Sequence, residues 1–215
     1  MKLLLVLRPE PGNRATIERA NAMGLDALPC PLFSTQPVDW TAPDPHDFDA
    51  LLFTSANALR HGGEALAALT RLPALAVGPA TAHAASASGF NVTITGGEDV
   101  DALLEALPGA QRLLHLTGAD HRHPETRHFI EPMIVYASVP LEAAIIPPGD
   151  FVALVHSARA GSHLAALAPD RGKVAIAAIS ARAAAACGPG WAAIAVSAEF
   201  SDSALLAVAA RLCQD

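Results

Sequence analysis

Residues 51–59 read LLFTSANAL and residues 153–161 read ALVHSARAG, so two similar stretches lie 102 residues apart in the chain. In both stretches a short apolar run ends near a serine, and an alanine-containing segment follows it. An apolar run of this length that gives way to helical spacing is typical of a buried parallel strand followed by a helix. The pair therefore predicts two α/β units built on one plan.

The same offset relates two further pairs of segments. Residues 76–78 (AVG) correspond to residues 178–180 (AIS), and residues 101–104 (DALL) correspond to residues 203–206 (SALL). Asp and Ser are interchangeable as helix N-caps, so the difference between Asp101 and Ser203 does not weaken the last match. Three matches in one register over about 50 residues indicate an internal duplication.

Apolar runs alternate with helical spacing along the whole chain, which predicts parallel sheets with helices on both faces and therefore an α/β fold. The strand candidates are residues 3–7, 50–53, 75–77, 91–94, 112–116, 133–136, 151–155, 174–179 and 192–196. The repeat units do not follow one another head to tail, because residues 3–8 precede the first unit. Their best counterpart, residues 112–117, lies between the units.

Two proline-marked stretches indicate where the chain crosses between the two domains. Residues 34–47 and residues 138–150 each contain three prolines, which favour extended chain and oppose helix. We expect both stretches to be linker strands. The prediction is a discontinuous first domain, residues 1–35 plus 148–215, and a second domain of residues 38–140.

Composition excludes several classes of protein. The chain is 52% hydrophobic with a mean hydropathy of +0.33, which is incompatible with wholesale disorder. Its formal charge of −7 argues against a nucleic-acid partner. The apolar opening at residues 3–7 is too short for a signal peptide or a membrane span. We expect a cytoplasmic protein with no membrane partner.

Nothing in the sequence indicates a metal or a cofactor. Its three cysteines are widely spaced with no CxxC motif, which favours neither a disulfide framework nor a zinc site. His121 and His123 lie in a polar loop in which no acidic partner is fixed beyond Glu125, so we expect no metal there. No GxGxxG or Walker motif is present, which disfavours a nucleotide-dependent enzyme.

An ordered series of short motifs resembles the uroporphyrinogen-III synthase family. In chain order the motifs are Leu7-Arg8-Pro9, residues 53–58 (FTSANA), residues 77–82 (VGPATA), residues 134–136 (IVY) and residues 156–159 (HSAR). Each motif is short and common, so their order over nearly the whole chain carries the resemblance. The departures are Leu7 and His156, where the family usually has threonine, and residues 179–183 (ISARA), where Gly and Thr are common.

The resemblance implies a fold of two similar three-layer parallel-sheet domains, a flavodoxin-like duplication, joined by two extended crossings. It implies a cofactor-free hydro-lyase of tetrapyrrole biosynthesis, the route to haem, sirohaem and cobalamin. The reaction is the cyclising dehydration of hydroxymethylbilane to uroporphyrinogen III, with the last pyrrole ring inverted. The expected protein is a monomer that binds a linear tetrapyrrole and receives it by transient handover from the upstream bilane-forming enzyme.

A bilane with eight carboxylates needs anion sites, and strand-to-helix turns supply these through free backbone N–H groups and the positive helix end. The predicted substrate-binding residues lie on such turns: Arg8, Thr54, Ser55, Asn57, Thr81, Ser157, Arg159, Ser180 and Arg182. From the residues alone, the serines could equally be N-caps and the arginines could be solvated.

From spacing alone, Tyr136, the only tyrosine, is better explained as a strand-end packing residue, but the resemblance implies that it assists water loss as the catalytic residue. The alternative to the enzyme is a catalytically silent or sensory two-domain α/β protein that binds an anionic small molecule.

Overall fold

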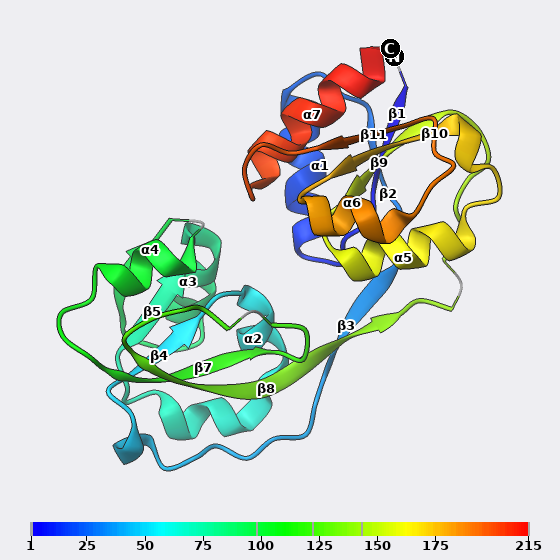
Figure 1. Ribbon diagram of the computed structural model, residues 1–215. Helices are drawn as coiled ribbons and strands as arrows, with labels where there is room; N and C mark the ends of the chain where they lie inside the picture. Colours follow the sequence, from blue (N-terminus) through cyan, green and yellow to red (C-terminus); the bar gives the residue numbers. More distant parts are fainter. Residues whose placement is uncertain (1, 98, 122, 143, 215) are drawn as a thin grey trace. The chain divides into compact units, whose positions relative to one another are not determined.

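The computed structural model describes residues 2–97, 99–121, 123–142 and 144–214, and Figure 1 shows their arrangement. The chain divides into two compact units: unit 1 is Met1–Ser34 with Val139–Asp215, and unit 2 is Thr35–Ser138. Each unit holds one sheet, which confirms the α/β prediction. Met1 and Asp215 of the predicted first domain, and Ala143 of the predicted second linker, lie outside the described residues.

Unit 1 is built on a five-stranded parallel sheet with the order β11-β10-β9-β1-β2. Its strands are β1 (Leu3–Val6), β2 (Ala27–Pro29), β9 (Phe151–Val155), β10 (Val174–Ala178) and β11 (Ala193–Val196). Counted along the chain within the unit, the order is 2-1-3-4-5, the flavodoxin-like arrangement. Every residue of β9 and β10 is buried, as expected for central parallel strands that are covered on both faces.

The helices of unit 1 form two pairs, because α1 contacts α7 and α5 contacts α6. They are α1 (Gly12–Ala22), α5 (Ala158–Leu167), α6 (Ala181–Cys187) and α7 (Asp202–Gln214), with a 3-10 turn, η3, at Arg171–Lys173. Ser157 and Ser180 begin α5 and α6 as N-caps: each hydroxyl accepts a hydrogen bond from a backbone N–H three residues on, at 3.1 and 3.2 Å.

Unit 2 holds a six-stranded sheet with the order β3-β8-β7-β4-β5-β6. Its strands are β3 (Phe33–Pro37), β4 (Ala50–Phe53), β5 (Ala74–Val77), β6 (Val92–Gly96), β7 (Arg112–Gly118) and β8 (Phe129–Pro140). Its helices are α2 (Ala56–His61), α3 (Pro79–Ala87) and α4 (Val100–Glu105), with 3-10 turns η1 (Pro45–Asp47) and η2 (Gly63–Leu69). The chain passes from one unit to the other within β3 and again within β8.

The two sheets share one spatial plan despite their different chain order. The series β6-β5-β4-β7-β8 in unit 2 corresponds to β11-β10-β9-β1-β2 in unit 1. The strands related by the 102-residue offset, such as β4 and β9, occupy the same place in each series. The pair β1–β2 in unit 1 therefore occupies the position that the pair β7–β8 occupies in unit 2. This circular permutation explains why the repeats do not follow one another head to tail.

The core of unit 2 lies on both sides of its sheet. Along β4, Leu51 and Phe53 belong to one buried cluster, whereas Ala50 and Leu52 belong to another. Successive side chains of a strand point to opposite faces, so this alternation places one cluster under each helical layer. The ring of Phe53 also packs edge-on against Phe90 at 5.1 Å.

We expect the fragment of residues 38–140 to fold on its own, because both halves of its core come from its own residues. Its urea denaturation, followed by far-ultraviolet circular dichroism, should be a single cooperative transition. A fragment of residues 33–140 restores the edge strand β3 and should be more stable. Gradual unfolding of both fragments would contradict the predicted domain boundary.

Candidate active site

Each unit gathers polar residues at the carboxyl edge of its sheet, where strands lead into helices. In unit 1 these are the predicted residues Arg8, Ser157, Arg159, Ser180 and Arg182; in unit 2 they are Thr54, Ser55, Asn57, Thr81 and, on β8, Tyr136. The structure thus divides the predicted set between the units, with five residues in each.

The turn after β4 combines a helix cap with a buried amide. Ser55 is the N-cap of α2 and accepts a hydrogen bond from the backbone N–H of Asn57 at 3.2 Å. The Asn57 side chain is 8% exposed, and its carbonyl oxygen Oδ1 has no hydrogen-bond partner among the described residues. Thr81, on α3, is also buried, so its hydroxyl lies below the surface of the unit.

Tyr136 is held tightly beside this turn. Burial raises the pKa of its phenol, while a hydrogen bond with the Ser55 side chain opposes that shift. A Cβ atom on Gly118, at the end of β7, would lie 2.6 Å from the tyrosine ring and 3.0 Å from the phenol oxygen. Glycine is therefore required at 118 for the ring to lie there. The phenol keeps its proton at neutral pH and can donate a hydrogen bond.

Several histidines surround the same edge of unit 2. The Nε2 atom of His115 lies 2.8 Å from the Thr54 hydroxyl, and burial lowers the pKa of His115 to about 4. The rings of His115 and His121 are 6.2 Å apart, and His123 lies 5.9 Å beyond His121. His61 packs 5.9 Å from the Tyr136 ring. Within the described ranges, no three His, Cys, Asp or Glu side chains are grouped so as to hold a metal.

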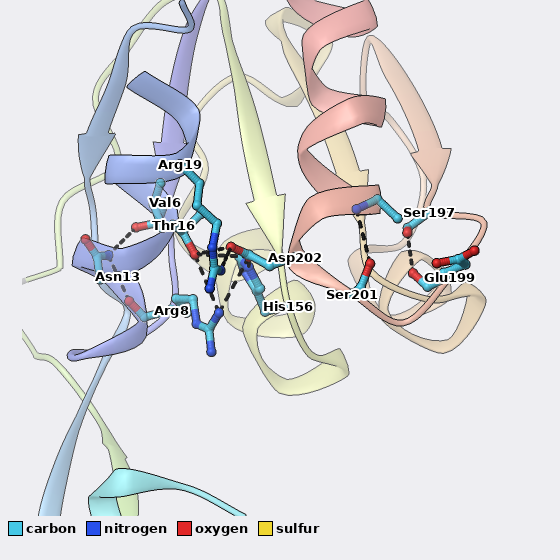
Figure 2. A network of polar contacts seen from close by, with 11 residues as sticks. Val6, Arg8, Asn13, Thr16, Arg19, His156, Ser197, Glu199, Ser201 and Asp202 are labelled. Carbon is cyan, nitrogen blue, oxygen red and sulfur yellow. Dashed lines mark hydrogen bonds and ion pairs between the residues drawn. The ribbon is translucent and has the colours of Figure 1, made fainter. Parts of the chain in front are cut away.

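Asp202 is the centre of a polar network in unit 1, shown in Figure 2. This carboxylate, 7% exposed at the start of α7, accepts hydrogen bonds from His156 Nε2 at 2.8 Å and from Thr16 Oγ1 at 3.0 Å. The Nη1 atom of Arg19 is 2.6 Å from Oδ2, and the Nη1 atom of Arg8 is 3.6 Å from Oδ1.

Burial, hydrogen bonds and neighbouring charges together set the ionisation states of Asp202 and His156. Burial alone would raise the pKa of Asp202, but the hydrogen bond from His156 and the neighbouring guanidiniums outweigh burial and lower that pKa well below its usual value. Burial lowers the pKa of His156 more than the Asp202 hydrogen bond raises it, so the imidazole is neutral at pH 7. Two arginines thus share one carboxylate.

Sequence reasoning found Arg8 but missed the rest of this network. Thr16 and Asp202 are separated by 186 residues, and no local pattern connects them. His156 stands out in the sequence only as a departure from the usual threonine. That departure is the one available signal, because an imidazole on the turn after β9 needs a nearby partner.

Three of the four remaining predicted residues of unit 1 have structural contacts. Ser157 and Ser180 cap their helices, as described above. Arg159 stacks over the Phe33 ring at 4.6 Å, and Arg182 is exposed on α6. These placements agree with binding roles but do not require them, whereas the contacts of Arg8 and Tyr136 fix each side chain in place.

Two permuted α/β units, each with polar strand-to-helix turns along one sheet edge, define a class of duplicated flavodoxin-like proteins. The profile of the family described as Uroporphyrinogen-III synthase HemD matches residues 14–207 of the chain. The chain belongs to the uroporphyrinogen-III synthase family, which confirms the resemblance seen in the motifs.

Solved structures are similar over the whole length of the chain. Uroporphyrinogen-III synthetase from Helicobacter pylori aligns with a TM-score of 0.64 and 18% identity, covering 99% of this chain and 100% of that one. A mutant uroporphyrinogen III synthase from Thermus thermophilus aligns with a TM-score of 0.49 and 18% identity over 100% of both chains. The first of these supports the two-unit fold. No curated protein sequence matches the chain.

Proposed function

We propose that this chain is a uroporphyrinogen-III synthase, a lyase that removes water from hydroxymethylbilane and closes it to uroporphyrinogen III with the last ring inverted. Membership of the family supports the reaction. The observation that carries the site is Tyr136, a partly buried and protonated phenol held between Ser55 and Gly118 at the carboxyl edge of the unit 2 sheet.

Loss of the hydroxyl group begins the reaction, and Tyr136 is the proposed catalytic residue for that step. Its phenol donates a hydrogen bond to the departing hydroxyl and stabilises the charge that develops as the carbon–oxygen bond breaks. The raised pKa of Tyr136 keeps the proton on the phenol until it is needed. The azafulvene cation that remains is then attacked by the substituted carbon of the last pyrrole, which gives a spiro intermediate. The original bond from that carbon to the bilane then breaks, and the chain recloses on the free carbon of the inverted ring with loss of a proton, which balances the proton that leaves with the hydroxyl as water.

Inversion depends on holding the bilane folded, because the bilane closes without inversion in the absence of the enzyme. The proposed anchors are the turns after β1, β4, β5, β9 and β10, where backbone N–H groups and helix N-termini suit carboxylates. Arg8, Arg159 and Arg182 are the proposed cationic contacts. The Ser55 and Ser157 hydroxyls cap their helices and so fix the shape of the two equivalent turns.

The product isomer tests the proposal directly. Hydroxymethylbilane incubated with the full chain, with a chelator present and no nucleotide or cofactor added, should yield the inverted isomer when the products are separated by liquid chromatography. Formation of the uninverted isomer alone, at the rate seen without protein, would favour the silent binder.

We also propose a cytoplasmic monomer that takes its substrate from the bilane-forming enzyme. None of the helices formed by the described residues combines the length and apolar character that a membrane span requires.

A further inference from the structure

The Asp202 network, defined here as Arg8, Thr16, Arg19, His156 and Asp202, is larger than a helix cap needs to be. A carboxylate at the start of a helix is stabilised by that helix alone. Here the buried carboxylate also receives one imidazole, one hydroxyl and two guanidiniums, which come from three separate stretches of chain. Figure 2 shows the two arginines converging on it from the turn after β1 and from α1.

Arg8 is fixed at both ends of its side chain. At the backbone, Asn13 Nδ2 donates 2.8 Å hydrogen bonds to the carbonyl oxygens of Val6 and Arg8, and the Asn13 side chain is 1% exposed. At the guanidinium, a Cβ on Gly12 would meet Arg8 Nε, so the glycine leaves open the space in which the Arg8 side chain lies. The guanidinium therefore lies close to Gly12, in the first turn of α1.

The network carries an excess of positive charge. Arg8 and Arg19 contribute two charges, Asp202 removes one, and His156 is neutral, so the sum is +1 at pH 7. Both arginines remain accessible, with 35% and 46% of their side-chain surface exposed, whereas Asp202 is buried beneath them. A guanidinium presents paired N–H donors in a plane, which matches the two oxygens of a carboxylate.

We propose that Arg8 and Arg19 together form a subsite for one carboxylate side chain of the bilane, and that Asp202 is the positioning residue that holds them at the correct distance. This inference rests on the proposed function and extends it, because Arg19, Thr16, His156 and Asp202 then become part of substrate binding. Thr16 and His156 also donate hydrogen bonds to the Asp202 carboxylate, and these bonds restrict rotation of the Asp202 side chain.

Asp202→Asn separates positioning from simple charge. The substitution removes the negative charge and raises the sum from +1 to +2, so an attraction by charge alone would tighten substrate binding. If Asp202 positions the arginines, binding instead weakens despite the added charge. We expect KM to rise about tenfold, with kcat and the proportion of inverted isomer unchanged. A lower or unchanged KM overturns the proposal. Asp202→Glu keeps the charge and should recover part of the loss.

Arg19→Met gives a second test that does not depend on substituting a buried residue. Its matched control is Arg14→Met, because Arg14 is an exposed arginine on the same helix. Calorimetric titration with uroporphyrin III, an octacarboxylate probe that undergoes no turnover, should show affinity reduced about tenfold by Arg19→Met and unchanged by Arg14→Met. Equal affinities of the two variants overturn the subsite. Because no turnover is needed, this result is separate from that of the product-isomer experiment.

Discussion

Replacing Tyr136 with phenylalanine is expected to slow uroporphyrinogen III formation by about 30- to 1,000-fold, corresponding to ~2–4 kcal/mol of lost transition-state stabilisation. The substitution removes one hydrogen-bond donor, and the remaining ring still fills the space beside Gly118. Positioning of the bilane does not depend on that donor, so the product of the slow variant should still be the inverted isomer. Single-turnover rates with chromatographic analysis of the isomers measure both quantities.

Ser55→Ala is the companion to that experiment. It removes the hydrogen bond between the Ser55 side chain and the phenol, together with the cap that Ser55 provides to the Asn57 N–H, but it leaves the phenol in place, so a smaller loss of rate is expected. A Tyr136→Phe variant as fast as the wild type would eliminate the catalytic role of the tyrosine, while the enzyme assignment would still depend on the wild-type product.

Acidification is expected to destabilise unit 2 by about 3 kcal/mol between pH 6.5 and pH 4, through His115. Burial lowers the pKa of this imidazole from its ordinary value of 6.5 to about 4 in the folded protein. Between pH 6.5 and pH 4, the His115 imidazole is protonated in the unfolded chain but mostly neutral in the folded protein. The free energy of unfolding is therefore highest above pH 6.5 and falls as the pH is lowered toward 4.

Urea denaturation at pH 7 and pH 5 measures this effect. In a Trp191→Phe background, the fluorescence of Trp40 reports unit 2 alone, since Trp191 is the other tryptophan and lies in unit 1. His115→Gln should remove most of the difference between the two pH values, whereas His83→Gln, at an exposed position on α3, should not. An equal pH dependence in all three proteins would refute the assignment to His115.

The sequence was sufficient to predict the strands of both units where the apolar runs were long and repeated. The short strand β2, with the sequence ALP, was not predicted because three residues ending in proline carry almost no periodic signal. The edge strand β3 overlaps the linker strand expected at residues 34–47, but it was not predicted as part of a sheet, since four of its five residues are polar or proline. Its place beside β8 becomes evident only when the sheet is assembled.

The candidate site was predictable only in part, for a similar reason. Turns at strand ends can be located from sequence, which is why Arg8, Ser55 and Ser157 were proposed. The contact of His115 with Thr54 could not be predicted, because the sequence around a histidine in an apolar strand does not indicate which side chain that histidine will contact. The same holds for Asp202, whose local sequence shows an acidic helix start and nothing of Thr16 or Arg19.

The permuted strand order has a consequence for how the protein is made. Residues 35–138 emerge from the ribosome as an uninterrupted block, so unit 2 is able to fold while synthesis continues. In contrast, β1 pairs with β2 and β9, and 121 residues separate the end of β2 from the start of β9. At about 5–20 residues per second, the apolar strand β1 waits roughly 6 to 24 s for its second neighbour. During that interval one edge of β1 has no strand beside it, so we expect nascent unit 1 to be more prone to aggregation than unit 2 until β9 has been made.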